Sequence, residues 1–172
     1  MFSEIKNQEI VIAQDSRAFE GILFIECTIL AQDINDLPVT FKNCQFDDCK
    51  FVDCVMINAF FDKCVFGIMS HFEECSMENM VMSDCSLSCR MGFVNCALSD
   101  MQIEDCEIFE PLSFRDCNLA NAKIDLAKMY KFQDDKISSA EKSLMIWGCW
   151  VHNDLLVNVG GLDMIARIEF ED

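Results

Sequence analysis

Cysteine and histidine are the residues of this chain whose side chains could do chemistry. The 172-residue sequence contains twelve cysteines and two histidines, His71 and His152. Thiolates can act as nucleophiles, form disulfides or bind a metal, and structural zinc sites combine two close Cys-x2–4-Cys pairs. Cys85 and Cys89 form such a pair, but no second pair or histidine set accompanies them outside the regular spacing described below. We therefore expect no metal site.

The other reactive groups also lack a catalytic arrangement. Neither histidine has a nearby nucleophile that would complete a triad, and Gly160 and Gly161 form an isolated pair rather than a phosphate-binding loop. The carboxylate pairs Asp47–Asp48 and Glu73–Glu74 are adjacent residues that we expect to face solvent. The sequence therefore predicts a protein without catalytic residues or cofactors, which is not an enzyme.

The cysteines are spaced by a repeat of five residues. A small residue comes first and a large apolar residue follows two positions later, as in Cys44 and Phe46. The small positions are Cys44, Cys49, Cys54, Ala59, Cys64, Ser70, Cys75, Met80, Cys85, Met91, Cys96, Met101, Cys106, Leu112, Cys117, Ala122 and Ala127. Every fourth step from Cys64 to Leu112 is one residue longer than the others, so four steps form a higher repeat of 5+5+5+6. Neither a helix nor an ordinary strand has this period, which indicates a repeat architecture.

Folding the sequence at the higher repeat aligns residues of one type in columns. Cysteines fill two columns, and phenylalanines fill a third. These columns are Cys44, Cys64, Cys85 and Cys106; Cys54, Cys75, Cys96 and Cys117; and Phe51, Phe72, Phe93 and Phe114. We expect both the small and the large residues to point inward, and the two residues after each large one to turn a corner in solvent, where Asx side chains favour tight turns.

This pattern resembles that of the pentapeptide-repeat proteins, from about residue 39 to residue 129. The resemblance implies an all-β solenoid, a right-handed quadrilateral β-helix. Inside it the cysteines would be reduced, buried thiols that pack as small apolar residues, and we expect no disulfides. Cys89 and Cys149 lie outside the pattern.

Charge is the second informative feature. The chain has 13 basic and 30 acidic residues, for a net charge of −17. Between Cys44 and Leu126, fifteen acidic residues face five basic ones, a balance of −10 on the repeats. Such a surface repels nucleic acid and acidic membranes and attracts basic proteins. Some pentapeptide-repeat proteins imitate duplex DNA and act on type II topoisomerases. The resemblance therefore implies a DNA-mimic regulator of a basic DNA-binding enzyme, and the alternative for the acidic residues is a solubilising surface.

The candidate partner-binding residues come from this charge and from the C-terminal segment. They are Asp53, Glu74, Asp116, Asp100, Asp105, Trp147 and Trp150. We expect Asp53, Glu74 and Asp116 to lie one turn apart on the same corner.

The repeats are predicted to occupy residues 1–130, and a small C-terminal cap residues 131–172. Ser138 and Glu141 fit a capping box, from which a helix would run to about Val151. This cap would cover the end of the solenoid. An alternative function uses it for dimerisation or for binding one protein partner, as a scaffold, effector domain or immunity protein.

The sequence has neither a membrane-spanning segment nor a recognisable secretory signal. No apolar run reaches the roughly 18 residues needed to cross a membrane. Residues 1–8 lack the basic start and apolar core of a secretory signal. We therefore expect a cytoplasmic protein that binds a protein partner and neither a membrane nor nucleic acid directly.

Overall fold

The chain folds as a parallel β-solenoid with four faces. The computed structural model describes residues 2–13, 15–32, 38–67, 69–87, 91–108, 112–129, 144–151 and 155–159. Within these ranges all regular elements are strands, each paired in parallel with the strand one turn before or after it. None of the described residues forms a helix long and apolar enough to cross a membrane. The all-β solenoid predicted from the repeat is confirmed.

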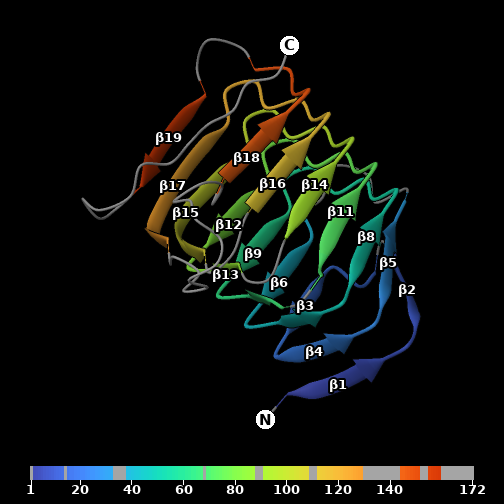
Figure 1. The fold of residues 1–172 in the computed structure, drawn as a ribbon. Helices are drawn as coiled ribbons and strands as arrows, with labels where there is room; N and C mark the ends of the chain where they lie inside the picture. The colour runs from blue at the N-terminus through green and yellow to red at the C-terminus, as the bar shows by residue number, and fades with distance from the viewer. Residues whose placement is uncertain are drawn as a thin grey trace, which may run out of the picture.

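Face A is built of regular strands, whereas the turns of face B are joined by isolated β-bridges. Face A is a seven-stranded sheet that lies along one side of the molecule (Figure 1). Its strands are β2 (Glu9–Ile12), β5 (Thr28–Ala31), β8 (Lys50–Val52), β11 (His71–Glu73), β14 (Gly92–Val94), β16 (Leu112–Arg115) and β18 (Leu144–Trp147). Face B follows face A along the chain and is joined by single bridges between Val55, Ser76, Ala97, Asn118 and Trp150.

Faces C and D together form a twelve-stranded sheet. Face C contains β3 (Ala18–Glu20), β6 (Thr40–Lys42), β9 (Phe60–Asp62), β12 (Val81–Ser83) and β19 (Leu156–Val159). Face D contains β1 (Ser3–Lys6), β4 (Ile22–Ile25), β7 (Gln45–Asp47), β10 (Val65–Phe66) and β13 (Ser86–Leu87). The longer strands β15 (Gln102–Ile108) and β17 (Lys123–Met129) run across both faces, and so join them into one sheet.

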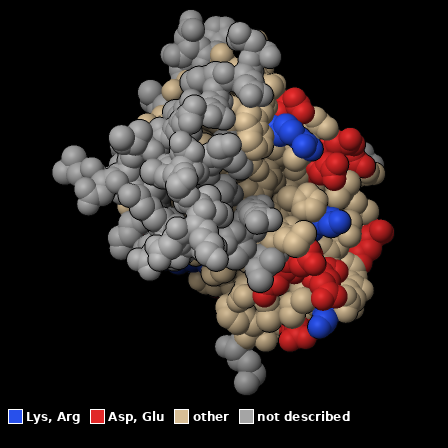
Figure 2. Space-filling model, viewed as in Figure 1, with Lys and Arg blue, Asp and Glu red and all other residues tan. Residues whose placement is uncertain are grey.

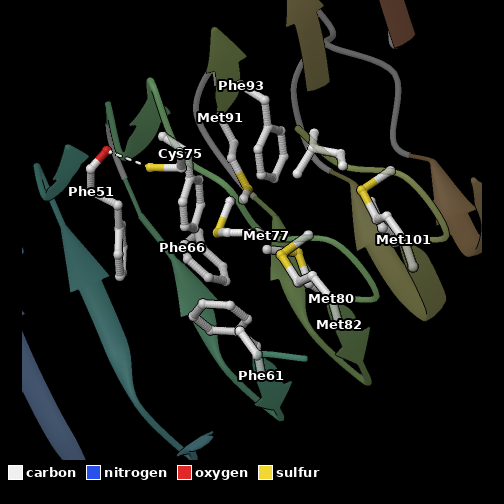
Figure 3. Packing of buried hydrophobic residues seen from close by; sticks show 14 of the residues in the cluster. Phe51, Phe61, Phe66, Cys75, Met77, Met80, Met82, Met91, Phe93 and Met101 are labelled. Carbon is white, nitrogen blue, oxygen red and sulfur yellow. Dashed lines mark hydrogen bonds between the residues drawn. The ribbon is translucent and has the colours of Figure 1, made fainter. Parts of the chain in front are cut away.

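The core is a shaft of stacked apolar side chains. Phe51, Phe72, Phe93 and Phe114 are consecutive register partners on face A. Their ring centroids are 4.3, 4.8 and 5.0 Å apart from one turn to the next, and the rings are nearly parallel. Methionines such as Met77, Met82 and Met101 fill the shaft beside them (Figure 3). The predicted phenylalanine column is confirmed, and its members are fully buried.

Corner residues adopt the left-handed backbone conformation. Among the described residues, sixteen that are not glycine have a positive φ, and most of them lie two positions after a large inward residue. Six of the sixteen are Asn and six are Asp. L-residues avoid this region, and Asn and Asp tolerate it best. The preference for Asx at the corners, expected from the sequence, therefore has a conformational cause.

The six-residue steps all lie at the corner from face D to face A. They connect β10 to β11, β13 to β14 and β15 to β16. Residues 130–143 connect β17 to β18 at the same corner. The extra residues are therefore inserted at one corner, and the stacking of the described strands continues past them.

Two sequence expectations are wrong. Residues 144–147, predicted as part of a helix, form strand β18, which pairs with β16 and places Leu144 and Ile146 in the core. The expected helical cap is not supported, and Ser138 and Glu141 lie outside the described residues. Ala127, assigned to a small inward position, is exposed, because a register shift places Leu126 opposite Cys106 instead.

Candidate interaction surface

The described cysteines have a structural role inside the solenoid, where their thiols donate hydrogen bonds to backbone carbonyls. The Cys75 thiol donates to the carbonyl of Phe51, one turn earlier, with sulfur and oxygen 3.3 Å apart. The other inward cysteines repeat this contact, and Ser70 replaces it with a hydroxyl 2.9 Å from the Phe46 oxygen. The eleven described cysteines are free thiols. The small inward residue is therefore not only compact but also supplies a hydrogen-bond donor for the carbonyl of a large inward residue one turn earlier.

Several of these thiols are poor nucleophiles. Burial raises the pKa of Cys49 from 9.0 to about 12. The side-chain hydrogen bond with Cys54, together with burial, raises the pKa of Cys75 to about 12. The hydrogen bond with Cys106, followed by the one with Cys64 and by burial, raises the pKa of Cys85. Because the thiolate is the reactive form, these three thiols are protonated and inert at neutral pH.

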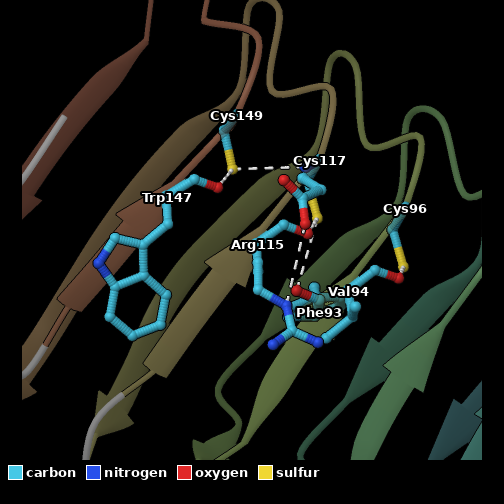
Figure 4. Close-up of polar contacts among 8 residues, drawn as sticks. Phe93, Val94, Cys96, Arg115, Cys117, Trp147 and Cys149 are labelled. Atoms are coloured by element: carbon cyan, nitrogen blue, oxygen red, sulfur yellow. Dashed lines mark hydrogen bonds and ion pairs between the residues drawn. The ribbon is translucent and has the colours of Figure 1, made fainter. Parts of the chain in front are cut away.

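The two cysteine columns are confirmed, and one of them is longer than the sequence predicted. Cys149, which we placed outside the repeats, lies above Cys117, and its sulfur is 3.4 Å from the Cys117 amide nitrogen. Its thiol also donates to the Trp147 carbonyl at 3.3 Å (Figure 4). The hydrogen bond with Cys117 and burial raise the pKa of Cys149. Thus the described interior is filled by apolar and thiol side chains and by the Ser70 hydroxyl, and the outer side chains are the ones that can meet a partner.

Three predicted residues share one corner, which we call the A/B corner. It consists of Asp53, Glu74, Asn95 and Asp116, all with φ between 50 and 56°. The Glu74 amide donates to the Val94 carbonyl at 3.0 Å, so the backbone of each turn is held by the next. Asp53 and Glu74 are one turn apart as expected. Asp116 is two turns from Glu74, because Asn95 lies between them.

The other two predicted acids lie on different corners. Asp100 is at the corner between faces B and C, where the Asn121 side-chain amide donates to its carboxylate at 3.2 Å. Asp105 is at the corner between faces C and D. Each five-residue step along the chain leads to the next corner. The five predicted acidic residues therefore lie on three different corners.

A second acidic region lies around the C/D corner, and of its residues the sequence prediction named only Asp105. Asp62, Ser83 and Glu104 are register partners on face C, and Asp84 and Asp105 follow on the adjacent corner. Lys42 is the register partner of Asp62, and Lys63 precedes Asp84 on the corner. Asp84 and Asp105 are one 5+5+5+6 repeat apart in the sequence, so the spacing of the corner residues carries the signal for this region.

Face A carries mixed charge. Lys50 and His71 are register partners on its outside, and Arg115 lies 3.9 Å from Asp116 as an exposed ion pair. Such a pair contributes little to stability. Figure 2 shows red acidic atoms along this side, interrupted by blue basic ones. The acidic character is therefore concentrated at corners rather than spread over a uniform face.

The two tryptophans lie at the C-terminal end of the A/B corner. Gly148, with φ of 57°, turns the chain between Trp147 on β18 and Trp150 on face B. Trp147 is half-buried and Trp150 is 61% exposed. The Trp147 carbonyl accepts the Asp116 amide hydrogen at 2.9 Å. The structure therefore joins the acidic corner and the tryptophans, which the sequence treated as separate sites, into one continuous surface.

The fold and this surface define a repeat protein of the parallel β-solenoid class. No protein-family model matches the sequence, and no curated protein matches it. Among solved structures, full-length QnrB1, a plasmid-mediated fluoroquinolone resistance protein, is similar with 11% identity, a TM-score of 0.36 and coverage of 97% of this chain and 94% of that one. A trypsin-treated QnrB1 variant has 12% identity and a TM-score of 0.31, with coverage of 88% and 84%.

Proposed function

We propose that this protein is a non-catalytic interaction module whose acidic A/B corner binds a basic protein partner. The partner class we favour is a DNA-binding enzyme such as a type II topoisomerase, whose DNA-binding groove an acidic rod would occupy. The chain's net charge of −17 and its stack of parallel turns support this class. A field of this sign steers basic partners toward the surface.

The proposal rests on the acidic residues at three of the four named positions of the A/B corner, where Asn would also fit the backbone. The left-handed corner positions of the described residues are filled by Asn and by Asp six times each. Asn therefore meets the conformational requirement without charge, as Asn95 does within the A/B corner itself. The carboxylates of Asp53 and Asp116 are not required by the backbone, which favours a role for their charge in binding.

A matched pair of triple variants tests this proposal. Asp53→Asn, Glu74→Asn and Asp116→Asn together remove three charges from the A/B corner and retain residues suited to left-handed φ. Asp62→Asn, Asp84→Asn and Asp105→Asn remove the same charge around the C/D corner. Affinity for a purified type II topoisomerase, measured by titration at low and high salt, should fall at least tenfold for the first variant and less for the second. Equal losses would indicate net charge alone, and unchanged binding would contradict the proposal.

The C-terminal tryptophans support a second candidate, a module that binds one protein partner through its C-terminal end. The exposure of Trp150 favours it, because aromatic side chains are enriched at interface centres. Trp150→Ala should then reduce binding by tenfold or more with little dependence on salt, whereas the A/B corner variant should retain its affinity. A pull-down from native lysate at two salt concentrations supplies the partner for this comparison.

A further inference from the structure

The N-terminal end of the solenoid is an open edge. β1, β2 and β3 are the outermost strands at this end of their sheets, so no described residue pairs with their outer sides (Figure 1). Phe2 and Val11 are 51% and 61% exposed there. Ile5, on β1, is only half-buried although it packs on the core. Unpaired strand edges are templates for pairing with another chain.

The backbone of β1 has a defined set of groups on its open side. The Ser3 amide donates to Gly21 and the Asn7 amide to Ile25, each at 3.0 Å, on the side of β4. Peptide groups alternate in direction along a strand, so the amides and carbonyls of Glu4 and Lys6 point to the open side. In an antiparallel ladder, two opposite residues of this kind exchange both of their backbone hydrogen bonds.

The side chains of β1 match the same arrangement. Ile5 is the register partner of buried Phe24 and faces the core, and the exposed Glu4 and Lys6 flank it on the outside. If two copies of β1 pair antiparallel about a twofold axis at Ile5, the acidic residue of each copy faces the basic residue of the other. Glu4 of one copy then lies opposite Lys6 of the other, and the contact occurs twice.

We propose that β1 is a dimerisation strand and that two copies of this chain pair antiparallel through it, centred on Ile5. Four backbone hydrogen bonds and two Glu4–Lys6 pairs form, and the two Ile5 side chains meet. The neighbouring edge strand β2 exposes Glu9 and Val11, so two copies of β2 could not form pairs of opposite charge. The interface is isologous and therefore closes at two copies rather than growing into a fibre. The dimer places two solenoids end to end, independently of the function proposed above.

Charge reversal on β1 tests the pairing. Sedimentation equilibrium over a wide concentration range should show a monomer–dimer equilibrium for the native chain. Glu4→Lys and Lys6→Glu should each weaken dimerisation by about tenfold or more, because like charges then lie opposite each other. The double variant Glu4→Lys with Lys6→Glu restores the order in reverse and should return to within about threefold of the native value.

Two further variants separate pairing from other effects. Glu20→Lys, on exposed β3 at the same end, changes the net charge as Glu4→Lys does and should leave the equilibrium unchanged. Glu4→Pro removes an amide that only the second copy would use, so it should abolish the dimer without lowering the urea unfolding midpoint. A native chain that stays monomeric would overturn the inference. So would a dimer that Glu4→Lys leaves intact or that Glu20→Lys weakens equally.

Discussion

Cys149 lies directly above Cys117 and packs against the core, although thirty-two residues separate the two cysteines in the chain. Neighbouring rungs of this ladder, such as Cys96 and Cys117, are otherwise one 5+5+5+6 turn apart. The excess length arises at the corner where residues 130–143 are inserted between β17 and β18. The strands after this insertion therefore belong to the same stack as those before it.

The first prediction tests that continuity. Ile146 is buried above Phe114. Ile146→Ala should lower the free energy of unfolding by about 2–5 kcal/mol because it leaves a cavity. Ser99 is the control, at a half-buried outer position of face B. Ser99→Ala should change stability by at most ~0.5 kcal/mol. Urea denaturation measures both changes, and equal effects would mean that β18 is not packed on the solenoid.

The second prediction concerns the phenylalanine column. Phe93 is fully buried between Phe72 and Phe114. Phe93→Ala should therefore cost about 3–5 kcal/mol. Glu78→Gln keeps an acceptor for the Ser76 hydroxyl on the outside. This control should cost at most ~0.5 kcal/mol. Chemical denaturation of both variants provides the comparison, and a small loss for Phe93→Ala would show that the shaft repacks around the gap.

The third prediction concerns the left-handed corners. Asn79 has φ of 57°. Asn79→Ala should cost about 1–2 kcal/mol, and Asn79→Gly should cost much less. Met69 has φ of 60° at an exposed corner, where its side chain is poorly suited to the backbone. Met69→Asn should therefore stabilise the protein by about 0.5–1 kcal/mol. Thermal unfolding would reveal the opposite signs, and a loss at Met69→Asn would contradict this account.

The fourth prediction concerns alkaline pH. The pKa of Cys49 is about 12 in the fold, against 9.0 for an ordinary thiol. Between these values the unfolded chain has lost the proton that the folded chain retains, so stability is complete below pH 9 and falls as the pH rises toward 12. The slope for one such thiol should reach about 1.4 kcal/mol per pH unit at most.

A variant separates this effect from the titration of other groups. Urea unfolding under reducing conditions at pH 8 and pH 10.5 should show a smaller loss for Cys49→Ala than for the native chain. Alanine fits this position, since Ala59 and Ala122 occupy equivalent inward sites. Identical pH dependence in the two proteins would show that Cys49 ionises freely in the fold.

The interior could be predicted from the sequence because each turn repeats the same environment. Phe51 and Phe72 meet equivalent neighbours, so one residue type fits at a fixed interval. The prediction failed where the interval changed. Leu144 to Val151 follow the same order of inward and corner residues, but the longer connection before them hides the register, so the sequence predicts a helix there instead of a strand.

The outer surface was less predictable, because its residues are not constrained by a common neighbour. The positions of Asp53, Glu74 and Asp116 at one corner follow from the repeat, and the structure agrees. Asp100 and Asp105 were grouped with them by charge alone, although each step of the repeat along the chain leads to the next corner. The contact between Asp116 and Trp147 joins two segments across the insertion, and no local pattern encodes it.

The interchange of Asn and Asp at the corners has a consequence for how such a protein can change. One substitution adds or removes a charge, while the left-handed turn, the stacked shaft and the strand register stay as they are. The scaffold can therefore be held constant while its outer electrostatic pattern drifts, corner by corner, toward a new partner. Sequence divergence on this architecture can be extensive outside and small inside, and two chains with the same turns can present unrelated surfaces.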